Sequence, residues 1–166
     1  VRLLSSTPEV SLIAPPSAPH RSVYLEETSQ PDSKTEFTVE YAYTSISRYA
    51  RMDPDRVTGH VPENVQEYVR EEPPHLVFLP EFEAILPKIV GSETNPYHIG
   101  KRIYTWLSEN MRYSYAREYS TIRNISRYTY RHRYGDCGQI TLLFMVLCRM
   151  SGIPARWESG WVLYPD

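Results

Sequence analysis

YGDCGQITLLFMVLCRMSGIPARWESGW, residues 134–161, is the stretch that decides the fold of this chain. From Cys137 to Ser151 it is mostly apolar, and its length and pattern predict one buried helix. Asp136 suits the N-cap position, where a carboxylate accepts a first-turn N–H, and Gly152-Ile153-Pro154 ends the helix. The residues that follow, Ala155–Trp161, are predicted to form a strand.

Cys137 is expected in the first turn of this helix. The N–H groups there have no partner inside the helix, and the helix dipole adds partial positive charge. Both effects favour the thiolate, which is the nucleophilic form of cysteine. A buried helix is also a rigid mount for a nucleophile, and Gly135 and Gly138 leave room for a substrate carbonyl. The competing interpretation is that Cys137 is an ordinary small core residue.

The pattern G-D-C-G-x(8)-L-C-R-x-x-G-I-P-A-R-W-x-S-G-W resembles the core motif of the transglutaminase-like superfamily, which has a papain-like cysteine-enzyme fold. The resemblance is specific from Gly135 to Trp161 and extends more loosely upstream to about Asn95. It implies an α+β fold, in which a helix bundle with the Cys137 helix packs on an antiparallel sheet that begins at Ala155. A β-rich N-terminal region is expected before this core.

The resemblance also implies a reaction. Members of the superfamily are cysteine peptidases, amidases, peptide-N-glycanases and transglutaminases. Cys137 would attack a peptide or side-chain amide to give a thioester, a histidine would move the proton, and an acidic residue would orient that histidine. Hydrolysis is favoured over cross-linking, because many bacterial-type members resemble peptidases or amidases. The expected partner is a protein or peptide substrate, with no cofactor and no metal.

The general base is not assigned. In the superfamily the histidine lies a few tens of residues after the G-I-P-A-R segment, and the printed sequence reaches Asp166 before such a position. All five histidines precede Cys137: His20, His60, His75, His98 and His132. His132 is interpreted as a solvated residue of an arginine-rich loop. We therefore expect that the histidine and acid belong to missing sequence or to a second chain, or that the protein is a non-catalytic binding or scaffold module.

Composition excludes some classes of function. Eighteen basic and twenty acidic residues give a net charge of −2, so no overall attraction to nucleic acid or to an anionic membrane surface is expected. No apolar run approaches the length of a membrane span. Cys137 and Cys148 would lie about 16 Å apart along a helix, too far for a disulfide. No intact signal peptide is expected at Val1, because no basic segment followed by a long apolar core occurs there. The compartment stays open, with a secreted or periplasmic location slightly favoured.

Three regions are predicted along the chain. Residues 1–20 read as an extended arm or linker. Residues 21–79 read as a β-rich region with a hairpin over 20–52, a turn at 30–34, and a connection that carries a short helical turn near Glu63–Val69. Residues 80–166 read as the N-terminal half of a transglutaminase-like core.

Within 80–166, one helix is predicted to begin at Pro80 and end at Gly91, with Pro87 inside it. Asn95 and Pro96 begin a second helix, whose apolar stripe includes Trp106. The Tyr- and Arg-rich residues 116–134 show no clear period and are predicted to form a long loop with local helix. Nucleic-acid binding by this loop is the third functional hypothesis, and a solvated loop is favoured over it. Trp157 and Trp161 share a strand face, and Cys148 is expected in the core.

Overall fold

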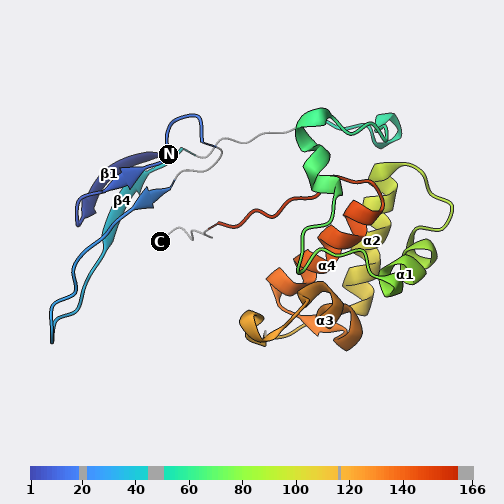
Figure 1. The fold of residues 1–166 in the computed structure, drawn as a ribbon. Coiled ribbons are helices and arrows are strands. Elements are labelled where there is room, and N and C mark those ends of the chain that lie inside the picture. Colours follow the sequence, from blue (N-terminus) through green and yellow to red (C-terminus); the bar gives the residue numbers. More distant parts are fainter. Residues whose placement is uncertain (19–21, 45–50, 116, 161–166) are drawn as a thin grey trace. The chain divides into compact units, whose positions relative to one another are not determined.

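The computed structural model describes residues 1–18, 22–44, 51–115 and 117–160 (Figure 1). These residues belong to two compact units, Val1–Arg51 and Met52–Asp166, which are treated separately. His20, Trp161 and Asp166 lie outside the described residues. Helices are combined with small sheets, so the chain is of mixed α+β composition, as predicted.

The N-terminal unit consists of two small antiparallel ladders. Strand β1 (Arg2–Thr7) pairs with β4 (Thr38–Ala42), and β2 (Leu12–Ile13) pairs with β3 (Val23–Tyr24). The arm expected at 1–20 is therefore wrong, because it contains two paired strands. The hairpin expected over 20–52 is also wrong, because the partner of β4 is β1. In the sequence, the apolar residues Phe37, Val39, Tyr41 and Tyr43 alternate with other residues, which predicts a half-buried strand over 35–43. This pattern located β4, but it contained no information about the partner of that strand.

The side chains of β4 do not form the half-buried face that its alternation predicted. Val39 and Ala42 are half-buried, whereas Tyr41 and Tyr43 are exposed. A two-stranded ladder buries a face only if another layer covers it. The predicted turn is confirmed, since the Ser33 N–H donates to the Gln30 carbonyl at 3.3 Å.

The second unit contains the helices and a third small sheet. In chain order its elements are η1 (Pro54–Arg56), η2 (Glu63–Val69), α1 (Pro80–Val90), α2 (Pro96–Asn110), β5 (Arg112–Tyr113), η3 (Tyr119–Thr121), α3 (Ile125–His132), β6 (Tyr134–Gly135) and α4 (Cys137–Met150). The η elements are 3₁₀ helices. Strands β5 and β6 are parallel.

The predicted boundaries of α1 and α2 are confirmed. Pro80 takes the first helical position of α1, Pro87 lies inside it, and Gly91 ends it at φ +58°, a conformation that suits glycine. Asn95 caps α2 by accepting hydrogen bonds from the N–H groups of Tyr97 and His98. The local chemistry of the residues at the helix ends therefore determines where these two helices begin and end.

Helix α4 is at the centre of the unit and packs against α1, α2 and α3 (Figure 1). Leu143, Val146 and Leu147 are fully buried and meet Phe82 of α1 and Ile103 of α2 in one core. Full burial of each such side chain stabilises the fold by about 1.5–3 kcal/mol. The central, buried helix predicted from the sequence is confirmed.

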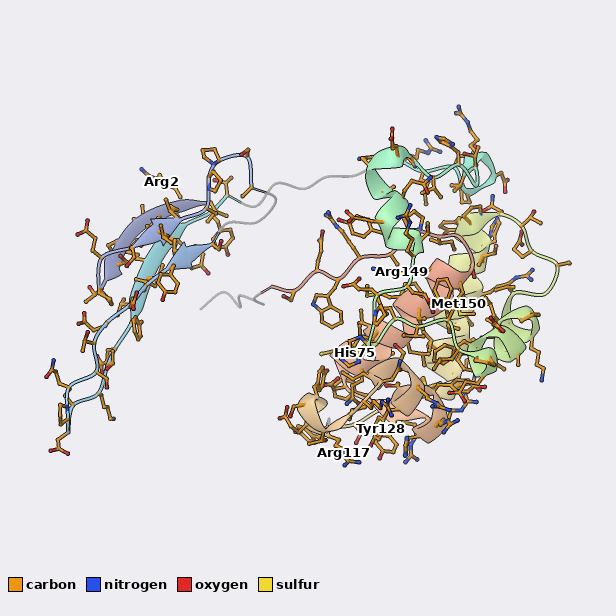
Figure 2. All side chains as sticks on the ribbon, in the orientation of Figure 1. Arg2, His75, Arg117, Tyr128, Arg149 and Met150 are labelled. Carbon is orange, nitrogen blue, oxygen red and sulfur yellow. The ribbon has the colours of Figure 1, made fainter. Side chains whose placement is uncertain are left out.

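Arg149 is buried near the end of α4, where α4 meets the η2 segment and the chain that leaves α4 (Figure 2). Its Nε donates to the Ala155 carbonyl at 2.8 Å and its Nη1 to the Arg70 carbonyl at 2.9 Å. Its Nη2 pairs with Glu72 at 3.1 Å. A buried guanidinium needs such partners, so Arg149 joins three segments of the unit.

The strand predicted from Ala155 is wrong for the described part of that segment, because residues 155–160 form no strand. The Ala155 N–H donates to the Tyr68 carbonyl at 3.0 Å, and the Ala155 carbonyl accepts from Arg149. Both backbone groups are therefore satisfied by η2 and α4 rather than by a neighbouring strand.

The Tyr- and Arg-rich segment is more ordered than predicted, because it contains the two-turn helix α3. Asn124 caps this helix by accepting from the Arg127 N–H at 2.7 Å. Its buried face consists of Ile125, Ser126 and Thr129. Two of these are polar, so a search for apolar periodicity could not detect the helix.

Cys148 predicts a measurable pH dependence of stability. Burial raises the pKa of its thiol from 9.0 to about 12. The contribution of the neutral thiol is complete below pH 9 and is lost as the pH rises from 9 to about 12. In urea unfolding, wild type should therefore lose about 1.4 kcal/mol more per pH unit in this range than Cys148→Ala. Equal losses in both proteins would contradict the assignment, and Cys137→Ala is the matched control.

Candidate active site

Cys137 is the first residue of α4, and its side chain is exposed, whereas Cys148 is buried. Asp136 precedes it in an extended conformation and caps the helix, since its Oδ1 accepts the Gln139 N–H at 2.8 Å. The predicted N-cap is confirmed. The cysteine therefore lies at the solvent-facing start of a helix that is largely buried along the rest of its length.

The β5–β6 ladder positions the chain that leads to Cys137. Arg112 and Tyr113 align with Tyr134 and Gly135, and the Ser114 N–H donates to the Gly135 carbonyl at 3.0 Å. Two residues after this ladder the helix begins. The turn before Cys137 is thus held from one side by the sheet and from the other by its own cap.

Tyr119 is a second polar group at this turn. Its hydroxyl donates to Asp136 Oδ1 at 2.5 Å, the same oxygen that caps α4. Burial, together with the hydrogen bond to Asp136 and the charges of Asp136 and Cys137, raises the pKa of Tyr119 above its ordinary value. The phenol therefore stays a neutral donor beside the cysteine at physiological pH.

Gly138 lets two aromatic residues approach the first turn of α4. A methyl group on its Cα would overlap the Tyr119 hydroxyl and lie 3.2 Å from the Trp157 ring. Trp157 comes from the segment that Arg149 anchors, and 43% of its surface is exposed. Tyr119 and Trp157 therefore flank the turn next to Cys137, and only glycine fits between them.

Three of the described histidines, His75, His98 and His132, make their contacts elsewhere. His75 Nδ1 accepts the Ile125 N–H at 3.3 Å, and His98 lies 3.7 Å from Asp55. His132 is exposed and stacks on Tyr128 with ring centroids 4.1 Å apart. Within the described ranges no histidine forms a hydrogen bond with Cys137, and His20 and Asp166 lie outside these ranges.

Gln139 is buried beneath the same turn. Its Nε2 reaches the Arg117 carbonyl only at 3.4 Å, and its Oε1 has no hydrogen-bond partner among the described residues. No group of three or more His, Cys, Asp or Glu that could hold a metal ion occurs in the described part of the chain. Across that same part, no helix has the length and apolar character needed to cross a bilayer.

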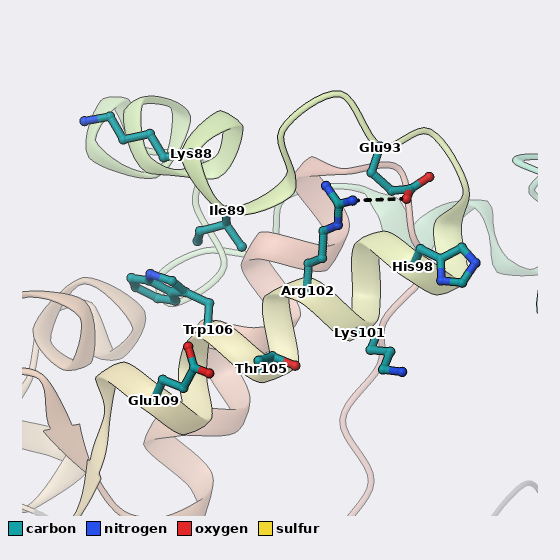
Figure 3. Close-up of a pocket in the computed structure, with 9 residues that line it drawn as sticks. All are labelled: Lys88, Ile89, Glu93, His98, Lys101, Arg102, Thr105, Trp106 and Glu109. Atoms are coloured by element: carbon teal, nitrogen blue, oxygen red, sulfur yellow. Dashed lines mark ion pairs between the residues drawn. The ribbon is translucent and has the colours of Figure 1, made fainter.

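A separate open pocket of about 410 Å³ lies between the end of α1 and α2 (Figure 3). Arg102 crosses it, donating to the Val90 carbonyl and pairing with Glu93 at 3.5 Å. Trp106 forms part of its wall. None of the residues around Cys137 lines this pocket, so it is not part of the candidate active site.

Sequence reasoning correctly predicted Cys137 in the first turn of the helix and Asp136 at its N-cap, but it did not single out Tyr119. Tyr119 is one of fourteen tyrosines, and it lies in a segment where tyrosine and arginine recur without a period. No sequence signal distinguishes it, because its role depends on η3 folding back against the start of α4. Trp157 was expected on a strand, whereas the structure places its ring beside Gly138 in a segment that forms no strand.

The model of the transglutaminase-like superfamily matches residues 83–166 of this chain. Searches of the curated proteins and of the solved structures returned no match.

Tyr119→Phe should destabilise the protein while leaving its shape intact, because it removes the hydrogen bond to the Asp136 carboxylate. Hydrogen bonds to charged groups contribute about 1.5–3 kcal/mol, and the partial exposure of this site places the expected loss near the lower limit. Urea unfolding at neutral pH measures it. Tyr104→Phe is the matched control, since Tyr104 is 66% exposed and should change stability by less than about 0.5 kcal/mol. Equal effects of the two variants would refute the role of the Tyr119 hydroxyl.

Proposed function

The chain belongs to the transglutaminase-like superfamily, and from this premise we propose that it is a cysteine enzyme that cleaves or transfers peptide or side-chain amides through a Cys137 thioester. The observation that carries the proposal is the exposed Cys137 at the capped start of the buried helix α4. We also propose that α4 is the nucleophile helix of a papain-like core.

The proposed reaction has two steps. In the first, the Cys137 sulfur bonds to the amide carbon, the C–N bond breaks, and the nitrogen leaves as ammonia or an amine with a proton from the general acid. In the second, water attacks the thioester and releases a carboxylic acid and the thiol. If an amine attacks instead, the product is a new amide.

The start of α4 suits the negative charge that forms on the carbonyl oxygen. The Asp136 side chain accepts the Gln139 N–H, and the N–H groups of Cys137 and Gly138 lie in the same first turn, where backbone N–H groups have no partner inside the helix. Backbone donors at a helix N-terminus stabilise such an oxyanion without reorganising. We propose the Cys137 N–H as one donor. Tyr119 and Trp157 fill the space beside Gly138, so we do not propose its N–H as the second donor.

We propose that the general base is a histidine from outside the described residues. The hydrogen bonds and ring contacts of His75, His98 and His132 are made away from Cys137. A histidine and an orienting carboxylate from a second chain are one source. Hydrolysis is the favoured outcome, because an exposed cysteine leaves the thioester open to water.

No histidine among the described residues forms a hydrogen bond with Cys137, and this observation favours a second candidate function. A superfamily member whose cysteine has no base would act as a binding or scaffold module. In that case the aromatic residues beside Gly138 would contact a partner, and no covalent intermediate would form.

The thioester proposal predicts that the full-length protein is acylated at Cys137 by a simple activated ester such as p-nitrophenyl acetate. Intact mass and peptide mapping should show one acetyl group on Cys137, formed at least about tenfold faster than on the same protein unfolded in urea, an effect within the range of one catalytic group. Cys137→Ala should abolish the adduct, and Cys148→Ala should retain it.

A rate no greater than that of the unfolded chain would contradict the thioester mechanism and favour the binding module. The Cys148→Ala control separates the two thiols, since both are acetylated to some extent once the protein unfolds. Comparing the acetylation rates of folded and unfolded protein corrects for accessibility, because Cys137 is exposed in both states.

A further inference from the structure

Positive charge is concentrated in one segment of the chain. Residues 112–134 contain six arginines and one glutamate, whereas the rest of the chain holds twelve basic and nineteen acidic residues. A protein with a net charge of −2 therefore carries a segment with a net charge of +5. All six of these arginines are exposed.

Three of the six arginines have a carboxylate or an aromatic ring of the protein as partner. Arg127 and Arg131 both pair with Glu81 of α1, each at 2.8 Å. Arg133 lies over the rings of Trp106 and Tyr130, 5.1 and 4.6 Å from their centroids. These contacts hold α3 against α1 and α2. The guanidinium groups of these three arginines are therefore already paired within the protein.

The other three arginines are Arg112, Arg117 and Arg123, and none of them forms an ion pair with any residue that the structure describes. Arg117 Nε donates only to the Thr121 hydroxyl, a neutral acceptor, at 3.1 Å. We call these three residues the arginine rim. Each of them is a guanidinium that can receive a carboxylate from outside without losing an existing charge partner.

The segment that carries the arginine rim runs beside the candidate active site at Arg112 and Arg117. The Arg112 N–H donates to the Arg133 carbonyl at 2.9 Å beside the strand that leads to Cys137. The Arg117 carbonyl accepts from Gln139 of α4, and Tyr119, two residues later, contacts Asp136. Figure 2 shows Arg117 on the same side of the unit as Tyr128. Arg123 follows η3 in the same segment.

Exposed aromatic rings accompany these charges. Tyr113 and Tyr115 are 72% and 97% exposed and lie between Arg112 and Arg117. Tyrosine and arginine are the side chains that dominate binding energy in protein interfaces, because they combine a large contact surface with directed hydrogen bonds. The segment therefore offers both charge and contact area to an extended chain.

We propose that the arginine rim binds an acidic peptide, so that the amide presented to Cys137 lies in a substrate segment rich in Asp and Glu. The substrate role rests on the proposed function, whereas the binding itself does not. The exposed rim charges attract carboxylates over a distance of about 10 Å at moderate ionic strength, and Arg–carboxylate pairs then orient the peptide.

The test measures binding to full-length Cys137→Ala protein, in which no thioester can form. The probe is a fluorescein-labelled peptide in which one glutamine is flanked on each side by glutamates, read by fluorescence anisotropy. A second peptide carries glutamines in place of the glutamates. The acidic peptide should bind at least about tenfold more tightly, and the difference should shrink as salt is raised.

Replacing the rim arginines by glutamine removes their charge and tests whether these residues bind the peptide. In the Cys137→Ala background, Arg112→Gln, Arg117→Gln and Arg123→Gln together should weaken binding of the acidic peptide about tenfold, the sum of three exposed charge pairs. Arg123→Gln alone should weaken it about twofold, and it serves as the test if the triple variant fails to fold.

The matched control removes the same charge elsewhere. Arg56, Lys88 and Lys101 are exposed and outside the segment, and their joint replacement by glutamine should leave binding within about twofold. Equal losses in the rim and control variants would mean that net charge alone attracts the peptide, and this would overturn the proposal. Equal binding of the acidic and neutral peptides would overturn it as well.

A fluorescent single-stranded oligonucleotide is the competing probe. Tighter binding of the oligonucleotide than of the acidic peptide would assign the rim to nucleic acid and reject the acidic-peptide proposal. None of these outcomes depends on acylation of Cys137. A failed binding test therefore leaves the thioester proposal standing, and a failed acylation test leaves the binding result standing.

Discussion

The buried guanidinium of Arg149 is the interaction on which the geometry of the second unit depends. A charge in a low-dielectric interior is tolerated only when its donors are bonded, and Arg149 meets this requirement with Ala155, Arg70 and Glu72. Because these partners belong to two other segments, satisfying one side chain brings both of them against α4. The segment held at Ala155 continues to Trp157, whose ring contacts the first turn at Gly138. A charge near one end of α4 thus helps to form the aromatic wall beside Cys137 at the other end.

The start of α4 depends on a second polar contact. Asp136 Oδ1 accepts hydrogen bonds from both the Gln139 N–H and the Tyr119 hydroxyl, so one carboxylate oxygen caps the helix and holds η3 against it. The apolar residues of α4 provide most of the stabilisation, and these polar contacts determine where Cys137 lies. This division is typical of sites in which a rigid core supports a nucleophile at a helix terminus.

Much of the helical unit could be predicted from the sequence. The helix ends are determined by local chemistry that can be recognised in the sequence alone, at Pro80, Gly91, Asn95 and Asp136. The partner of β4 could not be predicted, because alternation defines a strand but not its neighbour. The strand expected at Ala155 failed because its backbone groups found partners in Tyr68 and Arg149, far away in sequence. Tyr119 and the buried polar face of α3 were missed for the same reason: their roles exist only after segments distant in sequence have folded together.

The central claim is that Cys137 carries out amide chemistry, and its products test this most directly. Full-length protein is incubated with a pool of glutamine-containing peptides, with and without a primary amine, and the products are analysed by mass spectrometry. The account predicts peptide cleavage or loss of ammonia from glutamine, diverted to an amine adduct when the amine is present, and absent in Cys137→Ala. Unchanged peptides with a protein whose Cys137 is readily acylated would contradict it.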